Sequence, residues 1–424
     1  MKQFLVFQGP VSSRSGYGDH ARDLLKSLIA MDKFFIEVVD LRWGDCPRNG
    51  VSEKDKHLEK YFAGPQGIRK QPDVFVQLSV PNEFQPIGKF NIGITAGIET
   101  TVCDASWIQG CNKMNLIIVP SNHAKTVFKT TTYDQVDNNT NKKVAELQCT
   151  TPIEVLFEGA DLDIFHKTAK ISNEINEELK KIPEKFCFLF VGHWLNGAHG
   201  HDRKDVGKLI ETFIHTFKNN PSRTRPALIL KTSSATFSVI DRNQMQERIN
   251  NIVKKSGLKN SPKVYLLHGD LTETEMNELY HHPKIKVHVS FTKGEGFGRP
   301  LLEASLSGKP VIAPNWSGHI DFLKHSTLLP GDLKQVHKSV IWKNVILPES
   351  KWFYVNLIYA SRVLKDVFKN YKNYLNLAKK QLTYSKNEFS TDKMTSVFAD
   401  IMEKLVNVPQ EVKIALPKMN KISL

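Results

Sequence analysis

The stretch that most constrains the fold of this chain is KGEGFGRPLLEASLSGKPVIAP, residues 293–314. It follows a run of β-branched and apolar residues, 285–291, which predicts a buried strand. Residues 294–298, here called the glycine loop, carry almost no side-chain bulk. A proline suits the first turn of the helix expected over 300–306, and a glycine can end that helix. The stretch therefore predicts a strand, a glycine loop, a helix and a second strand.

Two kinds of group in this stretch indicate a ligand site. The loop delivers free backbone N–H groups to a helix N-terminus, which attracts phosphate. Two carboxylates flank that site, with Glu295 before the helix and Glu303 inside it. An acidic pair beside a phosphate site favours recognition of hydroxyl groups, as on a sugar or a ribose.

The length and charge of the chain limit the choice of architecture and partner. With 424 residues and 40% hydrophobic content, the chain is long enough for two domains with real cores. Its net charge of +14 favours anionic partners: nucleotides, nucleic acid or an acidic membrane. The alternative is a generally basic surface, because Lys and Arg are dispersed and form no basic run.

Cysteine spacing and hydropathy predict a cytoplasmic protein. The five cysteines are odd in number and scattered, without Cys-x-x-Cys spacing, which indicates free thiols in a reducing compartment. The N-terminal apolar run is too short for a signal peptide. No apolar run approaches the length of a transmembrane helix. Peripheral contact with an anionic membrane is kept as a candidate interaction.

The first third of the chain opens as strand, loop, helix and strand, which is common in nucleotide-handling α/β folds. Gly16, Tyr17 and Gly18 lie in the loop, which is neither a Walker P-loop nor a full dinucleotide fingerprint. A phosphate-facing loop and a tight turn without ligand fit it equally. The polar segment 130–143 is expected to be a surface loop.

A second α/β series begins after a charged connector, so we expect an α/β fold with two Rossmann-like domains that face a cleft. The expected divisions are 1–165 for the first domain, 166–185 for the linker and 186–385 for the second domain. Residues 386–424 are expected to hold a C-terminal helix that can cross back to the first domain, and a tail. A helix is also expected over 352–367.

The glycine stretch resembles a known family. Glu295 and Glu303 stand eight positions apart, and Gly296, Phe297 and Gly298 lie between them. In this context the pattern resembles the donor-site signature of retaining glycosyltransferases with two Rossmann-like domains, the GT-B fold, and especially of the GT4 family (glycosyl transferases group 1). The segments VPS at 119–121, FEGADLDIF at 157–165 and HGDL at 268–271 also resemble members of this family.

The resemblance implies a catalytic role for three residues. Lys204 matches the family lysine that contacts the donor diphosphate, with Arg203 beside it. Glu295 would hydrogen-bond hydroxyls of the transferred sugar. The family needs no metal ion and no cofactor, and its donor is a nucleotide-diphosphate sugar. Asp161-Leu162-Asp163 has the D-x-D form of metal-dependent transferases of another fold, but it lies within the linker match.

The resemblance also implies a set of donor-binding residues. Gly296, Phe297 and Gly298 would bring backbone N–H groups to the donor, and Glu303 would hold the ribose hydroxyls. Leu271 would contact the base through its backbone. Gly16, next to Tyr17, would close over the diphosphate from the first domain.

The sequence departs from the family pattern at two points. Many members carry an arginine after the strand at 186–191, as a second contact with the diphosphate, where this chain has His193. His193 could donate a hydrogen bond to the donor when protonated, or it could belong to a loop without a ligand. Arg203 or Lys231 could supply the missing charge. Many members also have a histidine near the reacting carbon, and the comparable segment 95–100 has none. Glu99 and Thr100 are candidates for contact with sugar or acceptor there, or else belong to the start of a helix.

The predicted function is therefore metal-independent, retaining transfer of a sugar to an unidentified acceptor hydroxyl on a glycan, lipid, protein or nucleic acid. One alternative is a sugar phosphorylase or nucleotide-sugar epimerase of the same fold. Another, raised only by the charge, is a DNA-binding or DNA-modifying protein.

Overall fold

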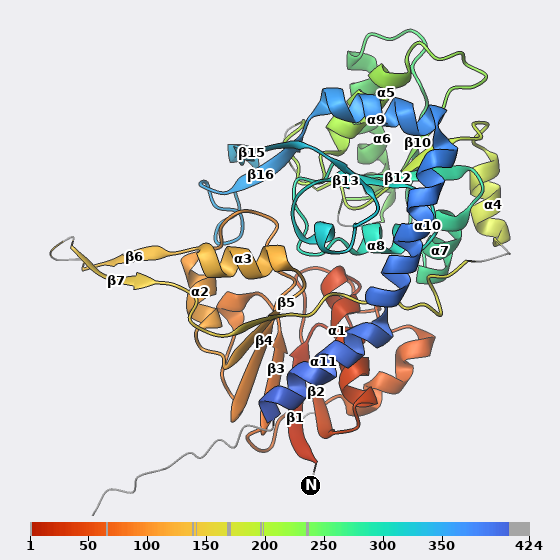
Figure 1. Cartoon of the computed structure of the whole chain (residues 1–424). Coiled ribbons are helices and arrows are strands. Elements are labelled where there is room, and N and C mark those ends of the chain that lie inside the picture. The colour runs from red at the N-terminus through yellow and green to blue at the C-terminus, as the bar shows by residue number, and fades with distance from the viewer. Residues whose placement is uncertain are drawn as a thin grey trace, which may run out of the picture.

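The structure is a computed structural model that describes residues 2–64, 67–137, 140, 142–167, 171–195, 197, 199–234 and 237–406. It contains two six-stranded parallel sheets, one in each half of the chain (Figure 1). This is the α/β architecture of two Rossmann-like domains that the sequence predicted.

The first sheet has the strand order β2-β1-β3-β4-β5-β8. Its strands are β1 Gln3–Gly9, β2 Phe34–Asp40, β3 Val74–Leu78, β4 Phe90–Ile94, β5 Leu116–Val119 and β8 Ile153–Val155. The helical segments between them are α1 Gly16–Ala30, η1 Glu53–Tyr61, η2 Pro81–Glu83, α2 Ala105–Cys111 and α3 Asn122–Thr130. Asp104 and Ser121 cap α2 and α3 by accepting hydrogen bonds from backbone N–H groups.

The second sheet has the order β11-β10-β9-β12-β13-β14, in which the strand order reverses beside β9. Its strands are β9 Cys187–Val191, β10 Ala227–Lys231, β11 Val264–Leu267, β12 Ile285–Val289, β13 Val311–Pro314 and β14 Thr327–Leu329. The helices are α4 Asn173–Lys180, α5 Val206–Phe217, α6 Val239–Lys255, α7 Glu273–His281 and α8 Arg299–Ser305, with short turns η3 Gly318–Asp321 and η4 Lys338–Val340.

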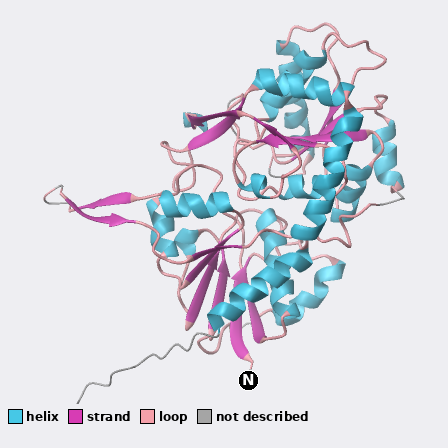
Figure 2. Cartoon of the chain, viewed as in Figure 1, coloured by secondary structure: helices cyan, strands magenta, loops and turns pink. Residues whose placement is uncertain are grey.

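Alternation along the buried strands places helices on both faces of each sheet (Figure 2). In β9, Phe188 and Phe190 pack with α5, α6 and the later helix α9, whereas Cys187 and Leu189 face the cluster that holds α4, α7 and α8. The carboxyl ends of the parallel strands therefore carry connecting loops and are not covered by these helices. Ligands of open α/β sheets bind at that edge.

The C-terminal part of the chain returns to the first domain. After the antiparallel pair β15 Gly331–Gln335 and β16 Lys351–Val355 come α9 Leu357–Lys369, α10 Tyr371–Glu388 and α11 Thr391–Val406. Met394, Phe398 and Met402 of α11 are buried in the core cluster that contains Leu24 and Leu28 of α1. Figure 1 shows α11 lying beside α1. The tail beyond 406 lies outside the described residues.

The structure corrects several expectations about secondary structure. The segment 130–143 is not a plain loop, because β6 Tyr133–Val136 pairs with β7 Lys143–Leu147 in a hairpin that projects from the molecule (Figure 2). The helix expected over 352–367 is strand β16 followed by α9. Trp352, Phe353 and Val355 of β16 are all buried, and an apolar run this short fits a strand as well as a helix. The helix α10 was not predicted.

Candidate functional site

The glycine loop lies at the carboxyl end of β12, between the two domains. Gly298 adopts a left-handed conformation, with φ of 103°, where α8 begins. A β-carbon on Gly294 would lie 2.0 Å from the carbonyl oxygen of Glu99, which belongs to the first domain. The Ser121 hydroxyl donates to the carbonyl of Gly296 at 2.6 Å. The loop is therefore packed on first-domain backbone, and small residues make that approach possible.

Three of the predicted site residues meet in one charged group. The Glu295 carboxylate accepts hydrogen bonds from the Lys204 ammonium and, at 3.2 Å, from the Arg203 guanidinium. All three side chains are largely buried, with exposed fractions of 10%, 11% and 18% for Glu295, Lys204 and Arg203. Burial alone would raise the pKa of Glu295, but the two cations hold it at about 2. The structure thus brings together the predicted catalytic residues.

Arg203 also spans the gap between the domains. Its guanidinium lies 3.1 Å from the Glu99 carboxylate and donates to the carbonyl of Gly294 at 3.0 Å. Glu99 follows β4, at the carboxyl edge of the first sheet. Lys204 lies in the turn before α5, because α5 begins only at Val206, after Asp205 in a left-handed conformation.

His193 and Lys231 stand close to this group. The Nδ1 atom of His193 lies 3.3 Å from the Ser233 hydroxyl. Burial lowers the pKa of His193, and the nearby charges of Lys204, Arg203 and Lys231 lower it further, so a neutral imidazole is favoured. Lys231 donates to the carbonyl of Gly269 at 2.6 Å. The positive charge in this part of the second domain therefore comes from lysine and arginine, and His193 adds none near neutral pH.

Glu303 lies on α8 within a polar network. Its carboxylate accepts a hydrogen bond from the Tyr280 hydroxyl at 3.1 Å, and its other oxygen lies 3.5 Å from Arg299. Burial raises the pKa of Glu303 to about 8, although Arg299 opposes the shift. Glu303 is thus held in place without a ligand.

Phe297 and Leu271 point their side chains into the protein. Phe297 is buried against Phe322, with ring centroids 4.9 Å apart. Leu271 packs against the same core cluster. The Phe297 side chain is therefore closed to a ligand, whereas Leu271 is partly buried and its backbone contact with the base stays a prediction.

Gly16 and Tyr17 are helical, which corrects the expectation of a loop at these positions. Gly16 is the exposed first residue of α1, and the Ser15 side chain caps the helix. Tyr17 stacks on Trp43 with ring centroids 4.1 Å apart, and its hydroxyl accepts from the backbone N–H of Ala96 at 3.2 Å. Burial raises the pKa of Tyr17 to about 12. Tyr17 therefore supports the end of β4 and is partly buried, whereas Gly16 is exposed.

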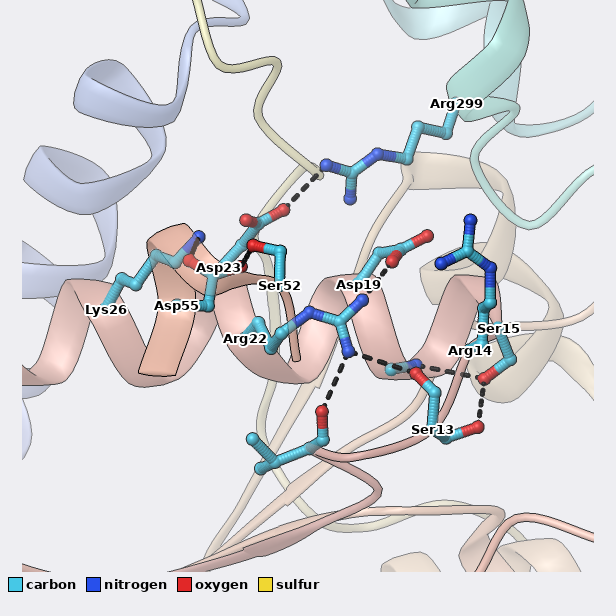
Figure 3. Close-up of polar contacts among 12 residues, drawn as sticks. Ser13, Arg14, Ser15, Asp19, Arg22, Asp23, Lys26, Ser52, Asp55 and Arg299 are labelled. Atoms are coloured by element: carbon cyan, nitrogen blue, oxygen red, sulfur yellow. Dashed lines mark hydrogen bonds and ion pairs between the residues drawn. The ribbon is translucent and has the colours of Figure 1, made fainter. Parts of the chain in front are cut away.

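Two ion pairs that the sequence did not indicate join the domains. Arg299 pairs with Asp23 of α1 at 2.8 Å, with both side chains only 12% exposed (Figure 3). Arg14 pairs with Asp270 at 2.7 Å. No sequence signal predicts these pairs, because each joins residues more than 250 positions apart.

Outside this group, His282 is buried, and burial lowers its pKa to about 4. All five cysteines are free thiols, as predicted. Among the described residues, no group of three or more His, Cys, Asp or Glu side chains is arranged to hold a metal ion. None of the described helices combines the length and apolar character needed to cross a bilayer.

Residues 174–331 match the model of a family described as Glycosyl transferases group 1. Comparison of the sequence with curated proteins found no match. Three solved structures are similar over nearly the whole chain. Sucrose-phosphate synthase from Thermosynechococcus elongatus is 14% identical, with a TM-score of 0.61, 96% of this chain covered and 99% of that chain. A glycosyltransferase from Rickettsia africae gives the same four values.

The third structure is Anabaena HepE in complex with UDP and glucose, which is 12% identical, with a TM-score of 0.55, 95% of this chain covered and 100% of that chain. At such low identity these similarities show the fold, which is GT-B in each case. The family match covers the glycine loop, Arg203, Lys204 and Glu303. On this evidence the chain is a glycosyltransferase of the GT-B fold, and residues 174–331 match the group 1 family.

Proposed function

We propose that the chain transfers a sugar from a nucleotide-diphosphate sugar to an acceptor hydroxyl, with retention of the anomeric configuration and without a metal ion. The observation that carries the proposal is the meeting of Lys204 and Arg203 at the Glu295 carboxylate, beside the glycine loop. Cations and a carboxylate in one buried place suit a substrate that is anionic at one end and rich in hydroxyls at the other.

The chemistry fits these residue types. Cleavage of the bond between sugar and phosphate builds negative charge on the departing diphosphate. Lys204 and Arg203 would stabilise that charge, and Lys231 stands on the neighbouring strand end. Preorganised charge of this kind is often the largest catalytic contribution. Cationic side chains would thus take the part that a metal ion has in other transferases.

Retention would follow from attack by the acceptor on the face that the leaving group departs from. A diphosphate oxygen can then take the acceptor's proton, so the mechanism needs no dedicated protein base. Glu295 would hold hydroxyls of the transferred sugar, and Glu303 would accept from the ribose hydroxyls. Backbone N–H groups of 296–298 would meet the donor, and the backbone of Leu271 would meet the base.

The donor is proposed by analogy with a similar structure, and the acceptor and location are proposed from the charge and the thiols of the chain. HepE was solved with UDP and glucose, so UDP-sugars are the first donors to test. The acceptor is a hydroxyl on a glycan, lipid, protein or nucleic acid, and the net charge of +14 favours an anionic one or an anionic membrane surface. Free thiols fit a cytoplasmic location.

The test is donor hydrolysis and binding. We expect one of UDP-glucose, UDP-N-acetylglucosamine, GDP-mannose and ADP-glucose to stabilise the protein in a thermal-shift assay. That donor should be hydrolysed equally with and without EDTA, and NMR should detect the retained anomer first. Lys204→Ala should lower the rate by about 100-fold or more, whereas Lys255→Ala, an exposed lysine of α6, should not. Loss of activity in EDTA or an inverted product would refute the proposed mechanism.

A further inference from the structure

Lys293, directly before the glycine loop, is a lysine with no exposed surface. Lysines are almost never fully buried unless they are paired, because desolvation of the ammonium group is costly. Its ammonium donates to the carbonyls of Gly200 at 2.9 Å and Asp202 at 2.7 Å, and lies 3.1 Å from the Asp205 carboxylate. Two of its three N–H donors are thus hydrogen-bonded to backbone carbonyls, and the Asp205 carboxylate supplies the opposite charge.

The acceptors of Lys293 all belong to the turn that carries Arg203 and Lys204. The backbone N–H of Lys293 also donates to the carbonyl of Arg203 at 2.7 Å. Asp205, the last residue of the turn, has φ of 51°, a left-handed conformation that is strained for a residue with a side chain. Lys293 therefore fixes the turn at four points, and one of them is a strained residue.

The other neighbours of Lys293 tie it to the glycine loop and to β16. Glu295, which accepts from both Lys204 and Arg203, lies only two residues further along the chain. The carbonyl of Lys293 accepts from the N–H of Phe353 at 3.1 Å, and the Tyr354 ring lies 4.7 Å from the ammonium. One residue thus links both segments whose charges meet at Glu295.

We propose that Lys293 is a positioning residue that keeps Arg203 and Lys204 aimed at the donor diphosphate. The inference rests on the proposed function, because the Lys293 side chain would act on the donor only through the turn that carries Arg203 and Lys204. A neutral side chain here would leave a buried carboxylate and two carbonyls without a partner. The turn would then move, and a displacement of about 1 Å at a reacting centre can cost about 100-fold in rate.

The matched control for Lys293 is Lys309. Its ammonium also donates to two backbone carbonyls, those of Tyr280 at 2.6 Å and His282 at 2.8 Å. These carbonyls lie at the C-terminal end of α7, and burial lowers the pKa of Lys309 to about 7. Lys293→Met and Lys309→Met therefore remove comparable bonds from different places.

The experiment compares the two variants with the wild type in the full chain, well below their melting temperatures. We expect both to melt earlier, but only Lys293→Met to lower kcat for donor hydrolysis by at least about tenfold and to weaken UDP binding. Hydrogen exchange should accelerate at residues 199–206 in Lys293→Met alone. Equal kcat and equal exchange in the two variants would overturn the proposal.

A second variant keeps the inference testable if Lys293→Met does not fold. Asp205→Asn preserves the shape of the turn and removes one charge, and we expect a smaller loss of kcat with faster exchange at 199–206. An unchanged Asp205→Asn protein would count against the proposal. If the wild type neither binds UDP nor hydrolyses any donor, the proposed function fails, and the exchange comparison still decides whether Lys293 holds the turn.

Discussion

Gly296 of the glycine loop packs directly on Ala96 of the first domain: a β-carbon on Gly296 would lie 2.1 Å from the carbonyl oxygen of Ala96. A β-carbon on Gly294 would likewise lie 2.0 Å from the carbonyl oxygen of Glu99. Both glycines have a role between the domains, and for Gly296 this role is additional to the backbone contact with the donor that the resemblance implies. The two domains are packed on each other at the place where the sugar is proposed to bind, so we expect donor entry to require them to separate.

Gly296→Ala is expected to prevent this closed arrangement. The added methyl group clashes with rigid backbone, so the domains should remain apart. X-ray scattering should report a larger radius of gyration, and the variant should lose about 1–3 kcal/mol of stability. Gly64→Ala is the control, because no atom lies within 4 Å of a β-carbon there. Identical scattering from Gly296→Ala and the wild type would show that the loop can yield.

The Arg299–Asp23 pair is expected to stabilise the closed form. Both side chains are largely buried, so Arg299→Met or Asp23→Asn alone leaves a partner without its counter-charge, at a cost of about 3–5 kcal/mol. The double variant should lose less than the sum of the two. Chemical denaturation measures this coupling, and the exposed Lys180 serves as control, where Lys180→Ala should cost less than about 1 kcal/mol. Additive losses would rule out direct coupling.

Gly16→Ala tests the contact proposed across the cleft. A β-carbon at Gly16 meets no atom within 4 Å, and the residue begins α1, so the free protein should be as stable as the wild type or slightly more stable. A methyl group facing the diphosphate should still weaken UDP binding in calorimetry. Unchanged affinity at unchanged stability would remove Gly16 from the donor site.

Glu303→Ala is expected to weaken UDP binding. If the ribose hydroxyls donate to this carboxylate, removing the carboxylate leaves the hydroxyls buried without an acceptor, which costs about 1–3 kcal/mol of binding free energy. Tyr280→Phe is the matched control, because it removes the hydroxyl bonded to Glu303 and keeps the carboxylate. We expect a smaller effect from Tyr280→Phe in calorimetry. Full affinity in Glu303→Ala would mean that the ribose binds elsewhere.

Glu303 is also expected to make stability depend on pH. Its folded pKa, about 8, lies above the ordinary value of 4.5, so the folded state holds a proton that the unfolded state releases. The contribution of this proton to stability is present below pH 4.5 and is lost as pH rises through 8. In Glu303→Gln the fall in melting temperature between pH 6 and pH 9 should shrink, whereas the exposed Glu349→Gln should behave as the wild type. An unchanged slope in Glu303→Gln would mean that the carboxyl is ionised throughout.

The architecture and the donor-side motif were predictable because their signals are local. Buried strands, short helices and the glycine loop each depend on a few consecutive residues, and the strand, loop, helix and strand expected over 285–314 agree with the structure. The errors fell where local patterns are ambiguous. A short aromatic run at 352–355 fits a strand as well as a helix, and the polar segment 130–143 gains its hairpin from pairing with a partner strand.

The sequence by itself determined two α/β domains, the glycine loop that carries Glu295, and the identity of the charged residues Arg203 and Lys204. Only the tertiary structure decided what these residues contact. Arg203 meets Glu99, Arg299 meets Asp23 and Lys293 meets Asp205, in each case across a long separation in sequence. The physical reason is that strand and helix formation responds to near neighbours, whereas the pairing of buried charges depends on which chain segments the packing of whole sheets brings within a few ångströms.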